Sequence, residues 1–216
     1  MFQTMLQQES MTNPYEAFMF SVFLTIMGFA AGRASGAELS LDALLDMLAL
    51  TRGQKCLSTN IWMTVSHMES PYRAMVVRSG EQTASIHEEV REHMAGVEAA
   101  NQDSPYREEV AALQDGIYLS ARAFDVRSAG RWPCLMSDEF FGLLKQYDSR
   151  ALVVLSNYAI IMQAFHELWW IGSWGRNLLS AVDKVFPKEE QARLNWSMAK
   201  MEHLMEVHYP DTKQGM

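Results

Sequence analysis

Cysteine is scarce in this chain. Only Cys56 and Cys134 occur among its 216 residues, and neither belongs to a paired motif. A disulfide scaffold would show an even set of closely spaced cysteines, so that class of protein is excluded, and the two lone thiols favour a reducing compartment. A domain of this length buries roughly 70% of its unfolded surface and folds without such crosslinks.

Positive charge is also sparse. Lysine and arginine number 18 against 26 aspartates and glutamates, which gives a net charge of −8, and no stretch of the chain is rich in Lys or Arg. Proteins that bind nucleic acids neutralise phosphates mainly with Lys and Arg. We therefore expect no binding to nucleic acid.

A long hydrophobic run is missing as well. The longest candidate, residues 17–31, is interrupted by Ser21, Thr25 and Gly28 and is shorter than the roughly twenty residues that a spanning helix needs. The first basic residue of the chain is Arg33, so the charged start of a signal peptide is not present either. The segment predicts a buried core helix, no stable membrane insertion and a cytoplasmic location.

Motifs for metals and cofactors are absent from the sequence. The string HELWW that begins at His166 lacks the second histidine of a zinc helix, and the pairs His203/His208 and His87/His93 are spaced poorly for one helix face. No nucleophile elbow, phosphate-binding loop or dinucleotide fingerprint occurs. We expect no metal and no cofactor. The acidic pairs, such as Glu108-Glu109, are expected to be solvated.

Helical periodicity is what the chain has in abundance. Apolar residues recur at three- and four-residue spacing, and no strand-like alternation or internal repeat is found. The expected helices cover residues 13–34, 40–53, 55–69, 82–101, 104–124, 137–147, 150–171, 176–186 and 189–207, with a turn at 130–133. The sequence thus predicts one all-α, bundle-like domain of about eight helices over residues 13–209, with a flexible arm at 1–12 and a tail at 210–216.

The segment 151–176 is the most informative of these. One ridge contains Tyr158, Met162, Phe165 and Trp169, and apolar residues also occupy another side. A helix that is apolar on more than one side is buried on more than one side. Its polar exceptions are Ser156, Asn157, Gln163, His166 and Glu167. Tyr158, Met162 and His166 share an i, i+4 row, and this row is either part of an ordinary core or the wall of a cavity.

Methionine is unusually frequent, with 16 residues. Flexible thioether side chains fill irregular apolar space and contact aromatic rings favourably. They fit a compliant pocket for a large guest and ordinary gap-filling in a core equally well.

Several strings, taken in order, resemble one protein family. They are Leu48–Gly53, Ser70–Tyr72, Trp132–Pro133 followed by Ser137–Leu144, Ala151–Ala159, and Trp169–Leu179. They are similar to the C-terminal effector domain of fungal zinc-cluster transcription factors of the sterol uptake control type. The resemblance implies a helical fold around a deep apolar cavity for a sterol-like ligand, and a homodimer. The six-cysteine zinc cluster and its basic flank are missing here, and Ser149 stands where the family usually has proline.

The expected pocket, without the DNA-binding zinc cluster, leaves two functions open. One is a cofactor-free cyclase, isomerase or Diels-Alderase-like pericyclase of fungal secondary metabolism, acting on a terpenoid, sterol or polyketide-like substrate through orientation and hydrogen bonding. The other is a non-catalytic ligand sensor or an accessory protein of a transcription regulator. The candidate catalytic donors are Tyr158, His166 and Arg176. The expected ligand-binding residues are Met162, Phe165, Trp169, Trp170 and Trp174.

Overall fold

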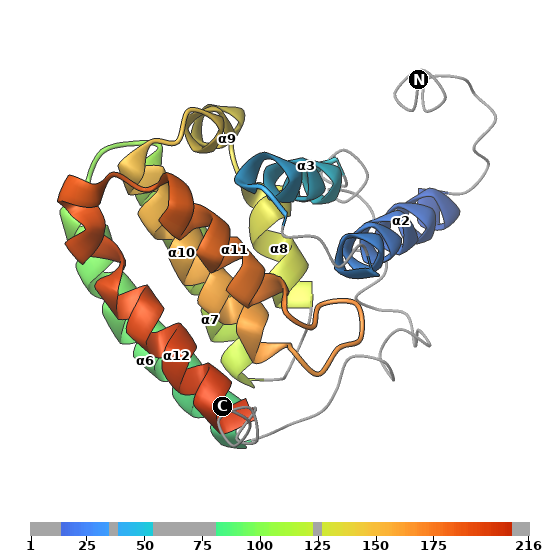
Figure 1. Cartoon of the computed structure of the whole chain (residues 1–216). Coiled ribbons are helices and arrows are strands. Elements are labelled where there is room, and N and C mark those ends of the chain that lie inside the picture. The colour runs from blue at the N-terminus through green and yellow to red at the C-terminus, as the bar shows by residue number, and fades with distance from the viewer. Residues whose placement is uncertain (1–13, 35–38, 54–80, 123–126, 209–216) are drawn as a thin grey trace.

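The described part of the chain is built almost wholly of helices. The computed structural model describes residues 14–34, 39–53, 81–122 and 127–208, and this part contains no strand, so the all-α prediction is confirmed. The helices, labelled in Figure 1, are α2 (Pro14–Ala34), α3 (Leu41–Arg52), α6 (Glu81–Ala100), α7 (Tyr106–Arg122), α8 (Arg127–Leu135), α9 (Asp138–Lys145), α10 (Ser149–Ala164), α11 (Trp174–Val185), the 3-10 helix η1 (Lys188–Leu194) and α12 (Asn195–His208). The expected arm, tail and helix 55–69 lie outside the described residues.

Side-chain caps fix the starts of three helices. The Ser40 hydroxyl accepts a hydrogen bond from the Ala43 amide at 3.3 Å, and the Ser137 hydroxyl accepts one from the Phe140 amide at 3.1 Å. Asp148 caps α10, because its side chain accepts hydrogen bonds of 3.0 Å from the backbone N–H groups of Arg150 and Ala151. Each cap satisfies amides that the first helical turn leaves unpaired.

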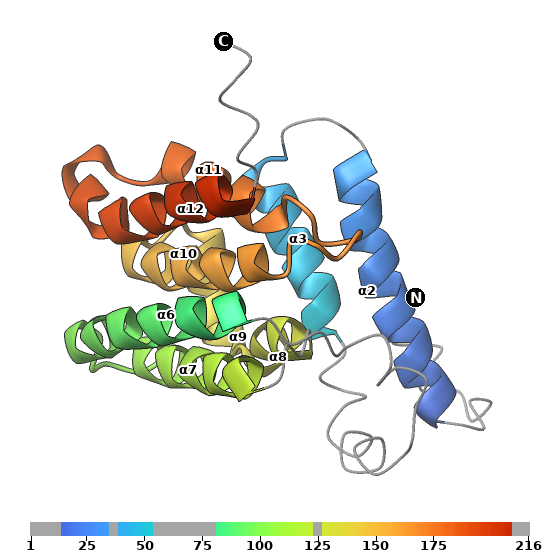
Figure 2. The same cartoon turned by 90° about the horizontal axis from the view of Figure 1, so that it is seen from below.

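Helix α10 lies at the centre of the bundle. It contacts α6, α7, α11 and α12 (Figures 1 and 2), and every residue from Ala151 to Ala164 is buried. The sequence is apolar around most of the helix, so each side has to be covered by another element. The neighbouring helices provide that cover.

Helices α10 and α11 pack closely against each other. A Cβ atom added at Gly175 would lie 2.4 Å from the Ala159 carbonyl oxygen and 2.6 Å from the Gln163 amide nitrogen. Because both are backbone atoms, only glycine allows the two helices to approach this closely. Gly172, with φ of 51°, ends the turn before α11, which begins at Trp174 and not at residue 176 as expected.

Helix α2 lies at the edge of the bundle, beside α3 (Figure 2). Phe29 is buried on its inner side, but Phe20, Phe23 and Met27 are 51%, 58% and 46% exposed. The prediction of a buried core helix is therefore wrong for one side of α2. No described helix is long and apolar enough to cross a bilayer.

Two further expectations about local structure are wrong. Residues 130–133 belong to α8, which keeps Pro133 inside the helix. The indole N–H of Trp132 donates to the Glu109 carbonyl oxygen at 3.1 Å, and the fully buried ring of Trp132 helps hold the helix in place despite the proline. The last expected helix is divided into η1 and α12, which meet at Asn195.

Candidate functional site

The row expected to carry Tyr158, Met162 and His166 is broken by the end of α10. The helix ends at Ala164, Phe165 follows as its C-cap, and His166 lies in the turn beyond with intermediate exposure. An α-helix rises 1.5 Å per residue, so Tyr158 lies about 9 Å along the axis from Ala164. The structure therefore separates the phenol from the imidazole.

Tyr158 lies deep between α10 and α8. Its side chain is 1% exposed, and its ring centroid is 4.7 Å from that of Trp132. Burial raises the pKa of the phenol far above its usual value, and the nearby Cys134 thiol adds to the rise. A neutral phenol donates a hydrogen bond, so the chemistry that Tyr158 offers is donation and not proton abstraction.

Four of the expected ligand-binding residues gather near the end of α10. Met162, Phe165 and Trp174 are buried, and Trp170 is half-buried. The Phe29 ring of α2 lies 4.4 Å from Trp174 and 5.9 Å from Trp170 between centroids, and the Trp174 indole N–H donates to the Phe29 carbonyl oxygen at 3.0 Å. We call Phe29, Trp170 and Trp174 the aromatic junction.

The remaining expected residues are at the surface. Trp169 is 60% exposed, so its assignment to an interior wall is wrong. Arg176 is also exposed, and only its backbone N–H reaches inward, donating to Gln163 Oε1 at 3.2 Å. The three candidate catalytic residues therefore do not form one interior cluster: Tyr158 is buried, His166 is half-buried, and Arg176 faces solvent.

Three polar side chains of α10 are buried, and two of them are paired with other helices. Ser156 Oγ lies 2.9 Å from Ser197 Oγ of α12, and Gln163 bonds to α11 through the Arg176 backbone. Asn157 donates its side-chain N–H to the Val153 carbonyl oxygen at 2.8 Å, but its Oδ1 has no hydrogen-bond partner among the residues that the structure describes. Such buried acceptors are uncommon in folded proteins.

The sequence analysis missed a buried carboxyl group. Glu109 was expected to be solvated, but it is 3% exposed, and its Oε1 accepts the Ser137 backbone N–H at 2.7 Å. The signal was present in the spacing, because Glu109 lies three residues after Tyr106 and four before Leu113, both of which are buried. Glu109 joins α7 to the start of α9.

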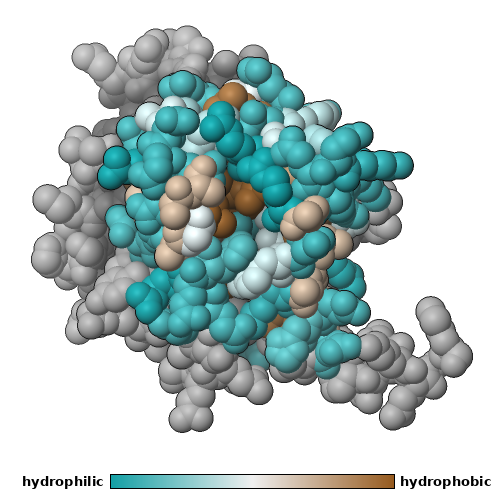
Figure 3. Space-filling model, turned by 90° about the vertical axis from the view of Figure 1, so that its left-hand side faces the viewer, coloured by the Kyte–Doolittle hydropathy of each residue, from teal (hydrophilic) through white to brown (hydrophobic). Residues whose placement is uncertain are grey.

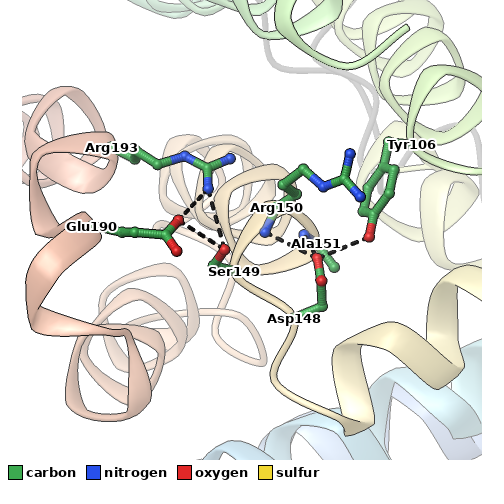
Figure 4. Close-up of polar contacts among 7 residues, drawn as sticks. All are labelled: Tyr106, Asp148, Ser149, Arg150, Ala151, Glu190 and Arg193. Atoms are coloured by element: carbon green, nitrogen blue, oxygen red, sulfur yellow. Dashed lines mark hydrogen bonds and ion pairs between the residues drawn. The ribbon is translucent and has the colours of Figure 1, made fainter. Parts of the chain in front are cut away.

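A polar network surrounds the start of α10 (Figure 4). The Tyr106 hydroxyl donates to Asp148 at 3.0 Å, and Ser149 donates to Glu190 at 2.9 Å. Burial and the bond to Asp148 raise the pKa of Tyr106, while the hydrogen bond from Arg193, followed by that from Ser149, lowers the pKa of Glu190. The network links α7, α10 and η1, and within it the negative charge of Glu190 is paired with the positive charge of Arg193.

The same side of the molecule is hollowed. Figure 3 shows a depression with hydrophobic side chains at its bottom and mostly hydrophilic ones around it. Apolar atoms at this end of the bundle are thus reachable from solvent.

Within the described ranges, no group of three or more His, Cys, Asp or Glu side chains is placed to hold a metal ion. Comparisons with protein-family models, with curated proteins and with solved structures give no match. The resemblance to fungal effector domains, and the fold and ligand it implies, stay predictions from the sequence.

Proposed function

We propose that the chain binds a bulky apolar small molecule at the aromatic junction. The observation that carries this proposal is the way α2 is attached: Phe29 contacts Trp170 and Trp174, and the side of α2 around it carries glycines. Gly32 lies against Trp174, where an added Cβ would be 3.2 Å from the indole ring. Trp170 is half-buried, so its ring provides the flat apolar surface that a guest can reach.

The chemistry of the junction selects for an apolar guest. No charged residue occurs in α2 between positions 17 and 32, and buried Met162 and Phe165 lie at the neighbouring end of α10. Ligand sites are lined mostly by hydrophobic and aromatic side chains with few polar groups. A terpenoid, sterol or polyketide-like skeleton has the size and apolarity that suit such a surface.

Tryptophan fluorescence and thermal unfolding test the proposal together. Farnesol or cholesterol, added to the purified chain, should change the indole emission and raise the melting temperature. At a hundredfold excess of ligand over its dissociation constant, the free energy of unfolding should rise by about 2.7 kcal/mol. Trp170→Ala should weaken binding several-fold. Trp196→Ala is the matched control, because Trp196 stacks on His93 at 3.9 Å between α12 and α6. Equal effects of the two substitutions, or no response to either compound, would contradict the site.

A cofactor-free cyclase or isomerase is the second candidate, and Tyr158 is the observation that favours it. A desolvated phenol that stays neutral can donate a hydrogen bond to a carbonyl that gains charge in the transition state, and such a bond is strongest in a dry site. On this hypothesis Tyr158→Phe lowers turnover of a polyene or terpenoid substrate by roughly 10²-fold while ligand-induced stabilisation persists. If the chain is a ligand sensor, neither the parent nor the Tyr158→Phe variant forms a product.

A further inference from the structure

Asn157, in the middle of α10, holds a buried acceptor that the described helices do not satisfy. Its side chain is fully buried, and its Nδ2 donates to the Val153 carbonyl oxygen at 2.8 Å, but its Oδ1 accepts no hydrogen bond from any described residue. The neighbouring Ser156 is equally buried and is paired with Ser197 of α12 at 2.9 Å. A buried polar atom without a partner costs free energy, so Asn157 indicates a donor from elsewhere.

The face of α10 that carries Asn157 leads to the surface. Arg150, Val153 and Asn157 are three and four positions apart and therefore share one side of the helix. Arg150 is half-buried, Val153 is 6% exposed, and Asn157 is 0% exposed. Helical side chains tilt toward the N-terminus, and the amide of Asn157 bonds to the turn before it. The amide therefore points toward the open end of this row.

Contacts with α12 show which parts of α6 and α10 lie at the same depth in the bundle. Trp196 of α12 stacks on His93 of α6 with 3.9 Å between the ring centroids. The next residue of α12, Ser197, is paired with Ser156 of α10. Because adjacent residues of α12 contact both helices, His93 and Ser156 lie at about the same depth.

The depression in Figure 3 matches the next helical turn outward from that depth. Since α6 ends on the side where α10 begins (Figure 1), this turn carries Val97 of α6 and Val153 of α10. The two valines are 8% and 6% exposed, whereas the other apolar residues of α10 up to Ala159 are at most 1% exposed. We therefore assign the hydrophobic bottom of the depression to this pair. We call the space bounded by Val97, Val153, Asn157 and Trp196 the end pocket.

We propose that the end pocket binds a small uncharged molecule with an apolar body and a hydroxyl or N–H group that donates to Asn157 Oδ1. The valine side chains have no polar atom, so they contact the apolar body. The charges at the mouth are already balanced, because Arg193 pairs with Glu190, and Arg150 Nη1 lies 3.8 Å from Asp103 Oδ2. A carboxylate would place a second acceptor against Oδ1, and an ammonium would be buried without a counter-charge.

A water molecule could also donate to Oδ1, but the end pocket suits it less well. Buried waters typically make about three hydrogen bonds. Here the Val97 and Val153 side chains provide none, and the Val153 carbonyl oxygen already accepts from Ser156 and Asn157. A molecule with one donor and an apolar body satisfies Oδ1 and covers the valines together. The end pocket lies at the start of α10 and the aromatic junction near its end, so this is a second site, independent of the proposed function.

Cyclohexanol and cyclohexanone test the donor, because they have nearly the same shape and only the alcohol carries an O–H group. NMR titration that follows the Trp196 indole N–H reports occupancy of the end pocket. The alcohol should bind weakly, as its size dictates, and roughly five- to tenfold more tightly than the ketone. Asn157→Leu keeps most of the side-chain volume without the acceptor and should make the two dissociation constants similar. Equal affinities in the parent, an unchanged ratio in the variant, or no response to either compound overturns the proposal.

Filling the end pocket gives a second, independent test. Val153→Met lengthens a side chain at its bottom and should abolish cyclohexanol binding. Ala164→Met is the matched control, because Ala164 is also 6% exposed and lies at the other end of α10, and it should bind as the parent does. Melting temperatures without ligand check that both variants fold. Undiminished binding by Val153→Met, or an equal loss with both variants, overturns the proposal. Shifts of the Trp170 indole N–H in place of that of Trp196 would assign the binding to the aromatic junction and overturn the end pocket alone.

Discussion

Helices α10 and α2 have similar compositions and opposite environments. Both have long stretches without charge, but α10 is buried from Ala151 to Ala164, whereas α2 exposes Phe20, Phe23 and Met27. The difference comes from the number of neighbours, because α10 is contacted from several sides and α2 mainly by α3 and the aromatic junction. An apolar sequence indicates that a helix has to be shielded from water, but the fold determines how many of its sides other helices of the same chain cover.

Removing one large side chain from each helix should give the largest contrast. Leu155 of α10 is fully buried, so Leu155→Ala leaves a cavity and should lower the free energy of unfolding by roughly 2–5 kcal/mol. Phe23→Ala, measured in dilute solution, should change it by less than about 0.5 kcal/mol. Urea denaturation of both variants measures the two values. Similar losses would show that α2 belongs to the core as α10 does.

Adding one carbon to α2 and to α11, the helix that packs closely on α10, should give a smaller contrast of the same sign. Gly175→Ala sets a Cβ against backbone atoms of α10, which cannot move aside without displacing the helix, and should cost about 1–3 kcal/mol. Gly28→Ala meets only the ends of two side chains, Met47 and Leu50, and should cost little. Thermal unfolding of the pair measures the difference. Equal melting temperatures would contradict the close approach of α10 and α11.

Replacing the unpaired buried amide of α10 should raise stability. Asn157→Leu removes an acceptor that has no hydrogen-bond partner, while the Val153 carbonyl oxygen keeps the Ser156 hydroxyl as a donor at 2.7 Å. We expect a gain of about 1 kcal/mol, and a loss of similar size for Ser156→Ala, which leaves Ser197 without its partner. Chemical denaturation measures both. A loss with Asn157→Leu would indicate that a bound water or ligand satisfies Oδ1.

The smallest effect concerns pH. Burial lowers the pKa of His93 below its usual 6.5, so the unfolded chain binds the proton more tightly than the folded chain. Stability should be complete above about pH 6.5 and should fall as the pH drops toward the lowered pKa. The stacked Trp196 limits the loss, because a protonated imidazole is attracted to its ring. His93→Gln should flatten this part of the melting-temperature profile between neutral and mildly acidic pH, and an unchanged slope would contradict the assignment.

The helices with clear start signals could be predicted from the sequence. Ser40 and Ser137 each precede an apolar periodic stretch. The helices expected from these positions begin there as α3 and α9, and each serine caps its helix. Proline at the first turn likewise marks the start of α2 at Pro14. These signals act within one turn of chain, so no knowledge of the rest of the fold is needed.

The end of α10 and the members of the site could not be predicted in the same way. Apolar residues continue past Ala164 as far as Ile171, with His166 and Glu167 as the polar exceptions, so periodicity gives no clear sign that the helix stops. Whether Trp169 is inside or outside depends on that stop, as does the loss of the helix face that Tyr158 and His166 were expected to share. Glu109 is buried because Ser137, far along the chain, supplies its hydrogen bond, and such long-range partners are not visible in local spacing.

The close approach at Gly175 bears on the order in which the molecule assembles. The glycine lies against Ala159 and Gln163 of the preceding helix, α10. By contrast, Thr51 and Cys134, whose hydrogen bond joins α3 to α8, are 83 positions apart. Closing a short loop costs less entropy than closing a long one, and contacts between near neighbours in sequence form faster. We therefore expect the α10–α11 hairpin to form before α3 pairs with α8 during folding.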